Sequence, residues 1–155
     1  MLHPANSYLD LAFLIPKHPP PGWQCPKFLI FFDDIAESIV VANFLPKRLP
    51  PKLCDKIVWF NADMLAEFRE VESMKLKAGD VWGLCCTDLF GMGVDLPDIE
   101  LIIQWKATCD LCTLWQRFGR CARKLSLMGR ALFLVESKFF DAKRELRVVA
   151  VQAWK

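Results

Sequence analysis

The amino-acid sequence predicts an α/β domain in which helices cover both faces of a mainly parallel sheet. Short apolar runs alternate with segments of helical spacing along most of the 155 residues. The runs are continuous, which is typical of strands buried on both faces. Helices between successive strands imply right-handed crossovers, and such crossovers produce a parallel sheet. Hydrophobic residues make up 54% of the chain, which is enough for a well-buried core.

Five apolar runs are predicted strands: KFLIFF (27–32), KIVWF (56–60), VWGLCC (81–86), LIIQW (101–105) and GRALFLV (129–135). In a parallel α/β sheet, ligands bind beyond the carboxyl ends of the strands. A site is therefore expected in the loops that follow these runs.

Three helices are predicted between the strands. The first follows Asp33 and Asp34, whose side chains can cap it. The second covers residues 64–79 and stops at Gly79, because glycine readily ends a helix. The third covers residues 109–123.

The chain is predicted to have three parts. Residues 1–26 form a leading segment or linker, because its Pro-Pro-Pro-Gly run stops helices and central strands, although LDLAFLI (9–15) could form one short strand. Residues 27–137 form the α/β domain. Residues 138–155 form a basic C-terminal helix with a solvated face.

The composition narrows the class of protein. Seven cysteines, two of them inside an apolar run, indicate reduced thiols and an intracellular location. No apolar run approaches the roughly 18 residues of a membrane-spanning helix, and no secretory signal is predicted. Net charge is only +2, but residues 117–147 carry nine Lys and Arg against three acids. This basic excess suggests a local phosphate-binding surface.

The segment TDLFGMGVDLPD (87–98) directly follows the third predicted strand. Gly91 and Gly93 allow the backbone to approach a phosphate or ribose closely. Asp95 can accept hydrogen bonds from a ribose hydroxyl or hold an arginine, and Thr87 can donate to a backbone phosphate. Taken alone, the segment is also compatible with an ordinary glycine-rich turn.

The segment WQRFGRCAR (115–123) places Arg120 and Arg123 three residues apart, so they share one face if the helix continues there. Gln116 lies one turn before Arg120. Guanidinium groups are planar and permanently charged, so two that point to one place suit the recognition of a polyphosphate. Taken alone, the segment is also compatible with a basic solvated face.

Together the two segments resemble motifs V and VI of superfamily 2 helicases, and FGMGVDLPD resembles the RecQ family in particular. FLIFFDDIAESIVVANFL (28–45) is similar to the motif IV region of that family. The resemblance covers roughly residues 27–136. It implies a three-layer RecA-like sandwich that is the second motor domain of an ATP-dependent 3′–5′ DNA helicase, with a nuclear location.

The resemblance assigns nucleotide-site roles to five residues. Arg120 and Arg123 match the motif VI arginines that reach across a cleft, as arginine fingers, to a triphosphate held by the first motor domain. Gln116 matches a polar position near the nucleotide. Gly93 and Asp95 match motif V positions that contact the nucleotide or link to motif VI.

The resemblance also implies partners and cofactors. Thr87 matches a position that touches the nucleic-acid backbone, and Arg69 matches an arginine that supports this contact. Single-stranded or unwinding DNA and an N-terminal RecA-like domain are therefore expected partners. ATP and Mg are expected cofactors, shared with that first motor domain.

The sequence departs from the family pattern at three positions. Asn61 stands where the family often has His, and this change is expected to affect a turn more than chemistry. Cys121 replaces a commonly small residue, and Lys124 replaces a common Asp with a positive charge beside the finger arginines. The changes at Cys121 and Lys124 are expected to alter the geometry of the finger arginines and so to affect activity.

The sequence also lacks two elements of a complete ATPase. It contains no GxxxxGK loop to cradle phosphates and no DExH or DExD box to hold magnesium. No metal ligands are predicted. We therefore expect no ATPase activity from this chain alone. The alternative is a truncated or degenerate module that binds nucleic acid or a partner without catalysis.

A rival hypothesis is a redox protein, because Cys109 and Cys112 form a CxxC pair near a helix start. The residues between them are Asp and Leu, with no Gly-Pro pair. A zinc site would need two more ligands, and only Cys121 is near. The helicase interpretation is therefore favoured.

Base stacking on tryptophan is a further possibility that the sequence raises. The tryptophans on predicted strands, and Trp115 in the third helix, are predicted to be in the core. Trp23 is the one tryptophan predicted to be exposed.

Overall fold

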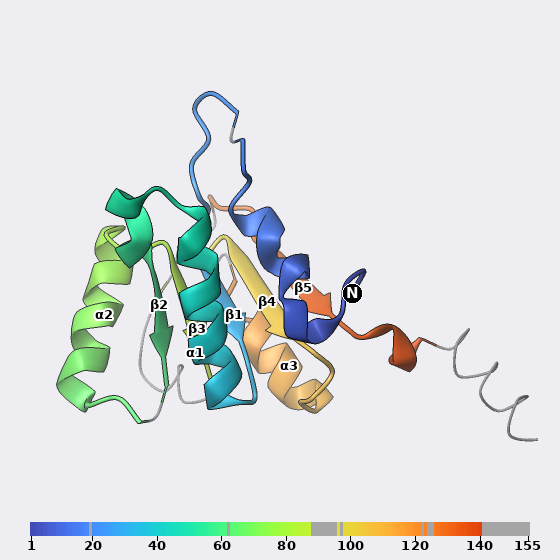
Figure 1. The fold of residues 1–155 in the computed structure, drawn as a ribbon. Helices are drawn as coiled ribbons and strands as arrows, with labels where there is room; N and C mark the ends of the chain where they lie inside the picture. The colour runs from blue at the N-terminus through green and yellow to red at the C-terminus, as the bar shows by residue number, and fades with distance from the viewer. Residues whose placement is uncertain are drawn as a thin grey trace, which may run out of the picture.

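The chain folds around a five-stranded sheet in which every neighbouring pair is parallel (Figure 1). The computed structural model describes residues 1–18, 20–61, 63–87, 96, 98–121, 123 and 126–140. The strands are β1 (Phe28–Phe31), β2 (Ile57–Phe60), β3 (Gly83–Cys86), β4 (Leu101–Trp105) and β5 (Arg130–Leu134). They confirm the five predicted strands and the α/β fold class.

The strand order β2-β3-β1-β4-β5 makes β1 the central strand. The chain runs from β1 to the edge strand β2, returns to β3 beside β1, and then crosses to β4 and β5 on the other side. The direction of winding therefore changes next to β1. In open parallel sheets, ligands bind beyond the carboxyl ends of the strands at such a switch point.

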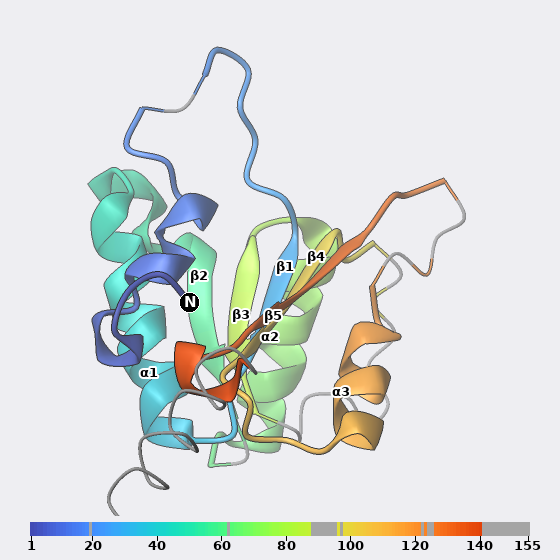
Figure 2. The ribbon, with the colours of Figure 1, turned by 90° about the vertical axis from the view of Figure 1, so that its right-hand side faces the viewer.

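Helices cover both faces of the sheet (Figure 2). One face carries α1 (Ile35–Phe44) and the N-terminal 3-10 helices, and the other carries α2 (Ala66–Ala78) and α3 (Leu111–Phe118). The side chains of β1 and of Phe32, the next residue, alternate between two cores: Phe28, Ile30 and Phe32 belong to the α1 core, and Leu29 and Phe31 to the α2 core. Successive strand residues point to opposite faces, so both cores are filled from one continuous apolar run.

Two of the predicted helix ends are confirmed. Asp34 caps α1, because its carboxylate accepts hydrogen bonds from the backbone N–H groups of Ala36 (2.7 Å) and Glu37 (3.4 Å). Gly79 ends α2 in the left-handed conformation, at φ 84°. Asp33, the other predicted cap, instead bonds to residues far along the chain.

The predicted strand at 9–15 is wrong. Residues Leu9–Leu14 form a 3-10 helix, and its Leu11 and Leu14, three residues apart, are buried in the α1 core. A 3-10 helix repeats every three residues, so this spacing places both leucines on one face. The predicted C-terminal helix begins instead with a 3-10 turn at Ser137–Phe139, and residues 141–155 lie outside the described residues.

The tryptophan predictions are partly wrong. Trp105 is fully buried, as expected, whereas Trp59 and Trp82 are only partly buried. Trp115 is 80% exposed, because it lies on the outer face of α3. Trp23 is partly buried and packs edge-on against Trp82, with ring centroids 6.4 Å apart.

Candidate functional site

The carboxyl ends of the central strands lie side by side. Cys86 of β3 is in register with Phe31 of β1 and with Phe60 of β2, and Phe31 is in register with Gln104 of β4. Neighbouring strands are about 4.8 Å apart, so the segments that begin just beyond these residues emerge next to one another. The motif V segment, which begins at Thr87, is one of them.

The third helix is shorter than predicted. It ends at Phe118, and the N–H groups of Arg120 and Cys121 bond back three residues, to the carbonyls of Arg117 (3.2 Å) and Phe118 (3.0 Å). The shared helix face expected for Arg120 and Arg123 required the helix to continue to Arg123, and α3 instead ends before both residues. The predicted helix fails here because Gly119 is a poor helix residue at the point where the helix ends.

The turn nevertheless brings the two arginines close together. Burial lowers the pKa of Arg120, and the neighbouring positive charge of Arg123 lowers it further. The thiol of Cys86, at the end of β3, is close enough to act in the opposite direction. Nε of Arg123 also donates to the carbonyl of Gly119 at 3.3 Å. The two guanidinium groups thus lie within electrostatic range of each other, and Arg120 lies within the same range of the end of β3.

The other predicted site residues lie on α3, on α2 and in the segment that follows β3. Gln116 is exposed on α3, one turn before Arg120. Thr87 is nearly buried directly after β3, and Arg69 is partly buried on the first turns of α2. Gly93 and Asp95 lie outside the described residues.

Arg69 has an unusual environment for a surface helix. Its Nε is buried and has no hydrogen-bond partner among the residues that the structure describes. Within the same part of the chain, the buried Nδ2 of Asn61, directly after β2, also lacks a partner, while its Oδ1 accepts from the N–H of Asp63 at 3.0 Å. Asn61 therefore organises a local turn at the end of β2. Buried donors are nearly always paired, so these two are suited to an acceptor that a ligand supplies.

Arg117 is a functional candidate that was not predicted from the sequence. Its side chain is only 3% exposed, and it donates from Nη2 to Asp33 Oδ1 at 2.6 Å and from Nη1 to Gln104 Oε1. Its guanidinium carbon also lies 5.1 Å from the centroid of the Phe31 ring, within range of a cation–π interaction. Gln104 was the available signal, because a lone amide inside the apolar run LIIQW needs a buried partner.

The carboxylate of Asp33 is held on both oxygens. Thr108 Oγ1 and Gln104 Nε2 (3.4 Å) donate to Oδ2, while Arg117 occupies Oδ1. Gln104 Nε2 also contacts the carbonyls of Trp105 (3.2 Å) and Lys106 (3.3 Å). We call Asp33, Gln104, Thr108 and Arg117 the Arg117 network. It joins the ends of β1 and β4 to the last turn of α3.

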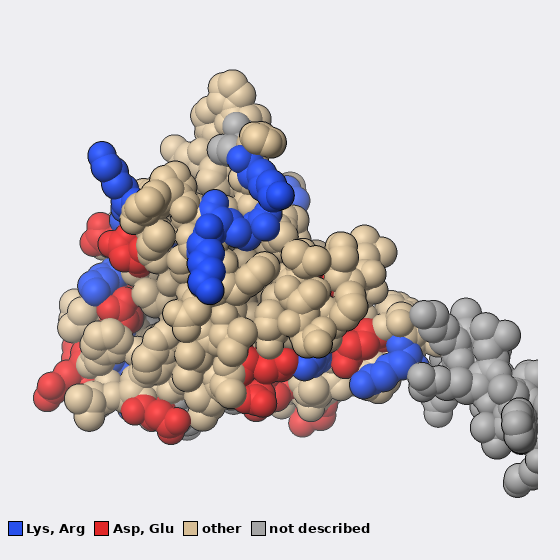
Figure 3. Space-filling view, in the orientation of Figure 1, with Lys and Arg blue, Asp and Glu red and all other residues tan. Residues whose placement is uncertain are grey.

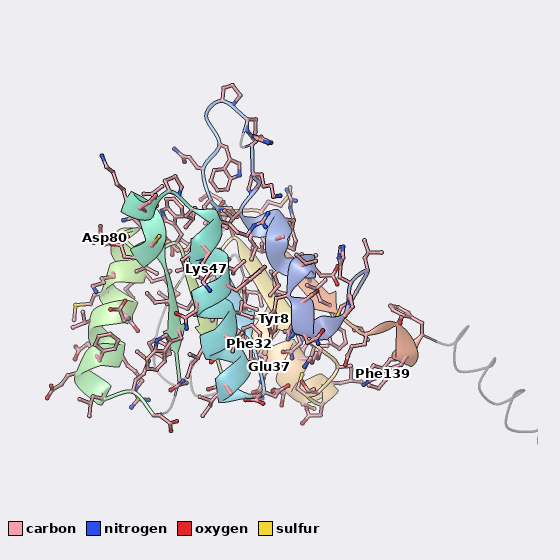
Figure 4. The ribbon with its side chains drawn as sticks, in the orientation of Figure 1. Tyr8, Phe32, Glu37, Lys47, Asp80 and Phe139 are labelled. Atoms are coloured by element: carbon pink, nitrogen blue, oxygen red, sulfur yellow. The ribbon has the colours of Figure 1, made fainter. Side chains whose placement is uncertain are left out.

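A second polar cluster adjoins the network on the α1 face. Lys106 pairs with Glu37 of α1, and Lys106 has the left-handed φ of 66°, which is uncommon for a residue with a side chain. Figure 4 shows Tyr8, Phe32 and Glu37 close together at one end of α1. Burial and the negative charge of Glu37 raise the pKa of Tyr8. The N-terminal segment is thereby tied to the turn that leads from β4 toward α3.

The charge on the α1 face is uneven. Figure 3 shows Lys and Arg gathered in its upper part, while Asp and Glu predominate along its lower margin. In the same orientation, Glu37 lies at the lower end of α1, near the carboxyl ends of the strands (Figure 4). An anion at this edge would therefore be repelled on the α1 side, and the arginines available to it come from the α2 and α3 side.

The sequence of this chain matches a known protein family. The sequence profile of the helicase conserved C-terminal domain matches residues 24–124. The chain belongs to this family. The match includes all of the sheet except β5, together with α1, α2, α3 and the arginine pair.

Curated relatives of this helicase C-terminal domain are much longer proteins. An uncharacterized ATP-dependent helicase of Methanocaldococcus jannaschii is 30% identical over 99 residues, which are 63% of this chain and 14% of the relative. The ATP-dependent RNA helicase ROK1 of Eremothecium gossypii is 34% identical over 107 residues, 66% of this chain and 17% of the relative. The chain thus spans less than a fifth of either protein.

Solved structures show the same fold. Domain 2 of the DEAD-box helicase Mss116p, bound to an RNA duplex, has a TM-score of 0.64 at 18% identity over 92% of this chain and 53% of that one. The helicase MrfA, bound to DNA, has a TM-score of 0.68 at 18% identity over 86% of this chain and 18% of that one. These similarities confirm the predicted RecA-like fold. The matches do not single out the RecQ family.

The domain's own residues fit one part of an ATP site. The adjacent guanidinium groups of Arg120 and Arg123 are suited to a polyphosphate, whose charge would relieve their mutual repulsion. Among the residues that the structure describes, no group of three His, Cys, Asp or Glu side chains could hold a metal ion. Within the same described part, no helix is both long and apolar enough to span a membrane.

One departure from the family pattern is accommodated inside the fold. Sγ of Cys121 lies 3.3 Å from the carbonyl oxygen of Arg130 and 3.7 Å from that of Ile99, and the residue packs against the α2 core. Lys124, the other departure in this segment, lies outside the described residues.

Proposed function

We propose that this chain is the second motor domain of an ATP-dependent nucleic-acid helicase and completes an ATP site whose other wall is an N-terminal RecA-like domain. The observation that carries the proposal is the turn after α3, which places Arg120 and Arg123 within electrostatic range of each other and of the end of β3. Two clustered guanidinium groups stabilise the charge that develops on a transferred phosphoryl group. ATP would supply that phosphoryl group, and Mg would help to neutralise its charge.

The outer face of α3 has the features of a surface that another domain covers. Leu111 and Trp115, one turn apart, are 79% and 80% exposed, and the exposed Gln116 lies beside them. Large apolar side chains that are exposed together commonly mark an interaction surface. Because this face directly precedes the arginine pair, the N-terminal RecA-like domain would cover it when the cleft closes.

Thr87 and Arg69 are proposed to contact the phosphate backbone of one nucleic-acid strand. Thr87 directly follows β3 and Arg69 lies on α2, and the buried Nε of Arg69, which has no hydrogen-bond partner among the described residues, suits a phosphate oxygen. Contacts of this kind carry most of the affinity for nucleic acid and weaken as salt rises. Gly93 and Asp95 keep their proposed nucleotide-site roles.

The proposed nucleic-acid strand is either DNA or RNA. The sequence motifs predict DNA and 3′–5′ movement, whereas the name of the ROK1 relative specifies RNA. The backbone contacts proposed here do not require either sugar. Binding of single-stranded DNA and RNA of equal length, measured at one salt concentration, distinguishes the two.

ATP turnover tests the main proposal. The chain alone should not hydrolyse ATP with single-stranded DNA or RNA, and adding a separate N-terminal RecA-like domain should restore turnover. Arg120→Ala should then reduce kcat by about 1,000-fold, the lower range for an arginine finger. Arg130→Ala is the matched control, because Arg130 is exposed at the amino end of β5. Clear turnover by the isolated chain that Arg120→Ala abolishes would overturn the proposal.

The degenerate-module alternative predicts a different pattern. Such a module binds nucleic acid or a partner, but turnover is not restored by any N-terminal domain with a complete phosphate-binding loop. Lys124 motivates this alternative, because its positive charge stands where the family commonly has an acid. Restored turnover in the mixture excludes it.

A further inference from the structure

Arg117 is a motif VI arginine whose side chain points into the fold instead of toward a ligand. Its guanidinium is enclosed by the Asp33 carboxylate, the Gln104 amide and the Phe31 ring. A group held on three sides is unable to swing out to a nucleotide without breaking the ion pair. Arg117 therefore has a different task from Arg120 and Arg123.

We propose that Arg117 is a positioning residue that fixes where the arginine pair is presented to the triphosphate. The proposal rests on the function proposed above for Arg120 and Arg123. It assigns the Arg117 network a mechanical role: Asp33 and Gln104 hold the end of α3 against the ends of β1 and β4, and the pair follows within six residues.

The connection between Arg117 and the pair is short and hydrogen-bonded. The N–H of Arg120 donates to the carbonyl of Arg117 at 3.2 Å, so the turn that carries Arg120 begins on the anchored residue itself. The N–H of Gly119 donates to the carbonyl of Trp115 at 2.9 Å, and Arg123 bonds back to Gly119. A change in the position of Arg117 would pass directly to both arginines.

α3 depends on such an anchor because it is only eight residues long. Helices of this length are marginal without tertiary contacts. Its Leu111 and Trp115 face solvent, its buried residues are Leu114 and Arg117, and its last residue, Phe118, is partly buried against the α2 core. Of the two buried residues, Arg117 is the one in the last turn, next to the arginine pair.

The presence of a buried arginine, where an apolar residue would also fit, supports a role in fixing the position of the end of α3. A buried ion pair costs desolvation energy, and apolar replacements of similar volume are often as stable. The planar guanidinium instead fixes direction, because its donors reach Asp33 and Gln104 at once. An apolar side chain in the same space would leave the end of α3 free to shift.

The first test uses the isolated chain. Arg117→Met and Arg117→Lys are compared with Arg130→Met, and the Nε–Hε signals of Arg120 and Arg123 are followed by NMR. In both Arg117 variants the two signals should shift, because Lys has one compact charge and lacks the guanidinium fork. Arg130→Met should leave them in place. Unshifted signals in a folded Arg117→Met chain would overturn the proposal.

The second test adds the N-terminal RecA-like domain and measures ATP turnover. Arg117→Met should lower kcat by about 10- to 100-fold, the cost of misplacing a catalytic group by about 1 Å, with KM for ATP changed less than about twofold. Arg117→Lys should not restore kcat. Wild-type kcat in either folded variant contradicts the proposal.

Two comparisons keep the outcomes separate. If Arg120→Ala leaves turnover unchanged, the proposed function fails, whereas the NMR shifts in the isolated chain still report whether Arg117 positions the pair. If Arg117→Met does not fold, Asp33→Asn replaces it, because it keeps the shape of the side chain and removes the charge that Arg117 contacts. The same shifts in the Arg120 and Arg123 signals are expected, and their absence overturns the proposal.

Discussion

The carboxylate of Asp33 lies 2.6 Å from the guanidinium of Arg117, 84 residues later in the chain. Asp34, its neighbour, instead caps the helix that begins one residue further on. Two adjacent acids thus act over very different ranges: one joins two layers of the fold, and the other stabilises a single turn.

This difference predicts unequal effects of two matched substitutions. Asp33→Ala leaves a buried positive charge without its partner and should lower the free energy of unfolding by about 3 kcal/mol. Asp34→Ala removes a helix cap and should cost about 1 kcal/mol. Urea denaturation of both variants measures the difference. Equal losses would show that the ion pair contributes no more than the cap does.

The strands could be predicted from the sequence because burial on both faces requires continuous apolar runs. Residues 28–31 and 101–105 needed no tertiary information for this. The 3-10 helix at Leu9–Leu14 could not be distinguished from a strand, because a short apolar run lacks a decisive period. Trp115 was wrongly placed in the core, because its exposure depends on which face of α3 meets the sheet.

The candidate site was only partly predictable from the sequence. Arg120 and Arg123 stand out by residue type and spacing, and the structure brings them together by a turn in place of the predicted helix. The Arg117 network was not predicted. Its partners are separated along the chain, and only the register of β1 with β4 places Asp33 and Gln104 within reach of one arginine.

The two tryptophans near the site should differ sharply in stability tests. Trp115→Ala should change the free energy of unfolding by less than about 0.5 kcal/mol, because the ring is already in solvent. Trp105→Ala should cost about 4 kcal/mol, because it removes a buried ring that packs against Tyr8. Thermal and urea unfolding check both values. A large loss for Trp115→Ala would place its ring in a contact inside the folded chain.

Trp115 should matter for association instead. If the N-terminal RecA-like domain covers α3, Trp115→Ala should weaken binding between the two domains by about tenfold or more in the presence of ATP, as expected for a buried aromatic anchor. Calorimetric titration of one domain into the other measures the change. Unaltered affinity would assign this exposed face to a different partner.

Arg69 should contribute to the salt dependence of nucleic-acid binding. Arg69→Ala should weaken binding to all strands to a similar degree and reduce the slope of log affinity against log salt by about 1. Lys77→Ala is the matched control, because Lys77 is an exposed cation at the other end of α2. Fluorescence anisotropy at several salt concentrations gives both slopes. Identical slopes for the two variants would remove Arg69 from the phosphate-binding surface.

The cysteines should react with iodoacetamide in an order set by burial. Cys54 and Cys112 are exposed and should be alkylated first at pH 8. Burial raises the pKa of Cys25 to about 12, so only about one in 10,000 of its thiols is ionised at that pH. Burial also raises the pKa of Cys85, which should react only after unfolding. Peptide mass spectrometry gives the order, and early labelling of Cys85 would contradict the buried strand.

Asp110 should give α3 a stability that depends on pH. Its carboxylate accepts a hydrogen bond from the N–H of Thr113 at 2.8 Å, and this bond is the main cause that lowers its pKa below the ordinary 3.8. A carboxylate with a lowered pKa in the folded state stabilises the fold above the unfolded value of about 3.8, and this contribution is lost as pH falls through the folded value.

Asp110→Asn separates the charge of this cap from its hydrogen bond. Asparagine caps helices about as well as aspartate, so the variant keeps the bond to Thr113 and loses the titration. The wild type should therefore be the more stable protein at pH 7, because the negative charge also interacts favourably with the helix N-terminus. Urea midpoints measured between pH 7 and pH 3 should converge below about pH 4. A difference that stays constant over this range would mean that the Asp110 charge does not stabilise α3, and the start of the helix would then depend on the hydrogen bond alone.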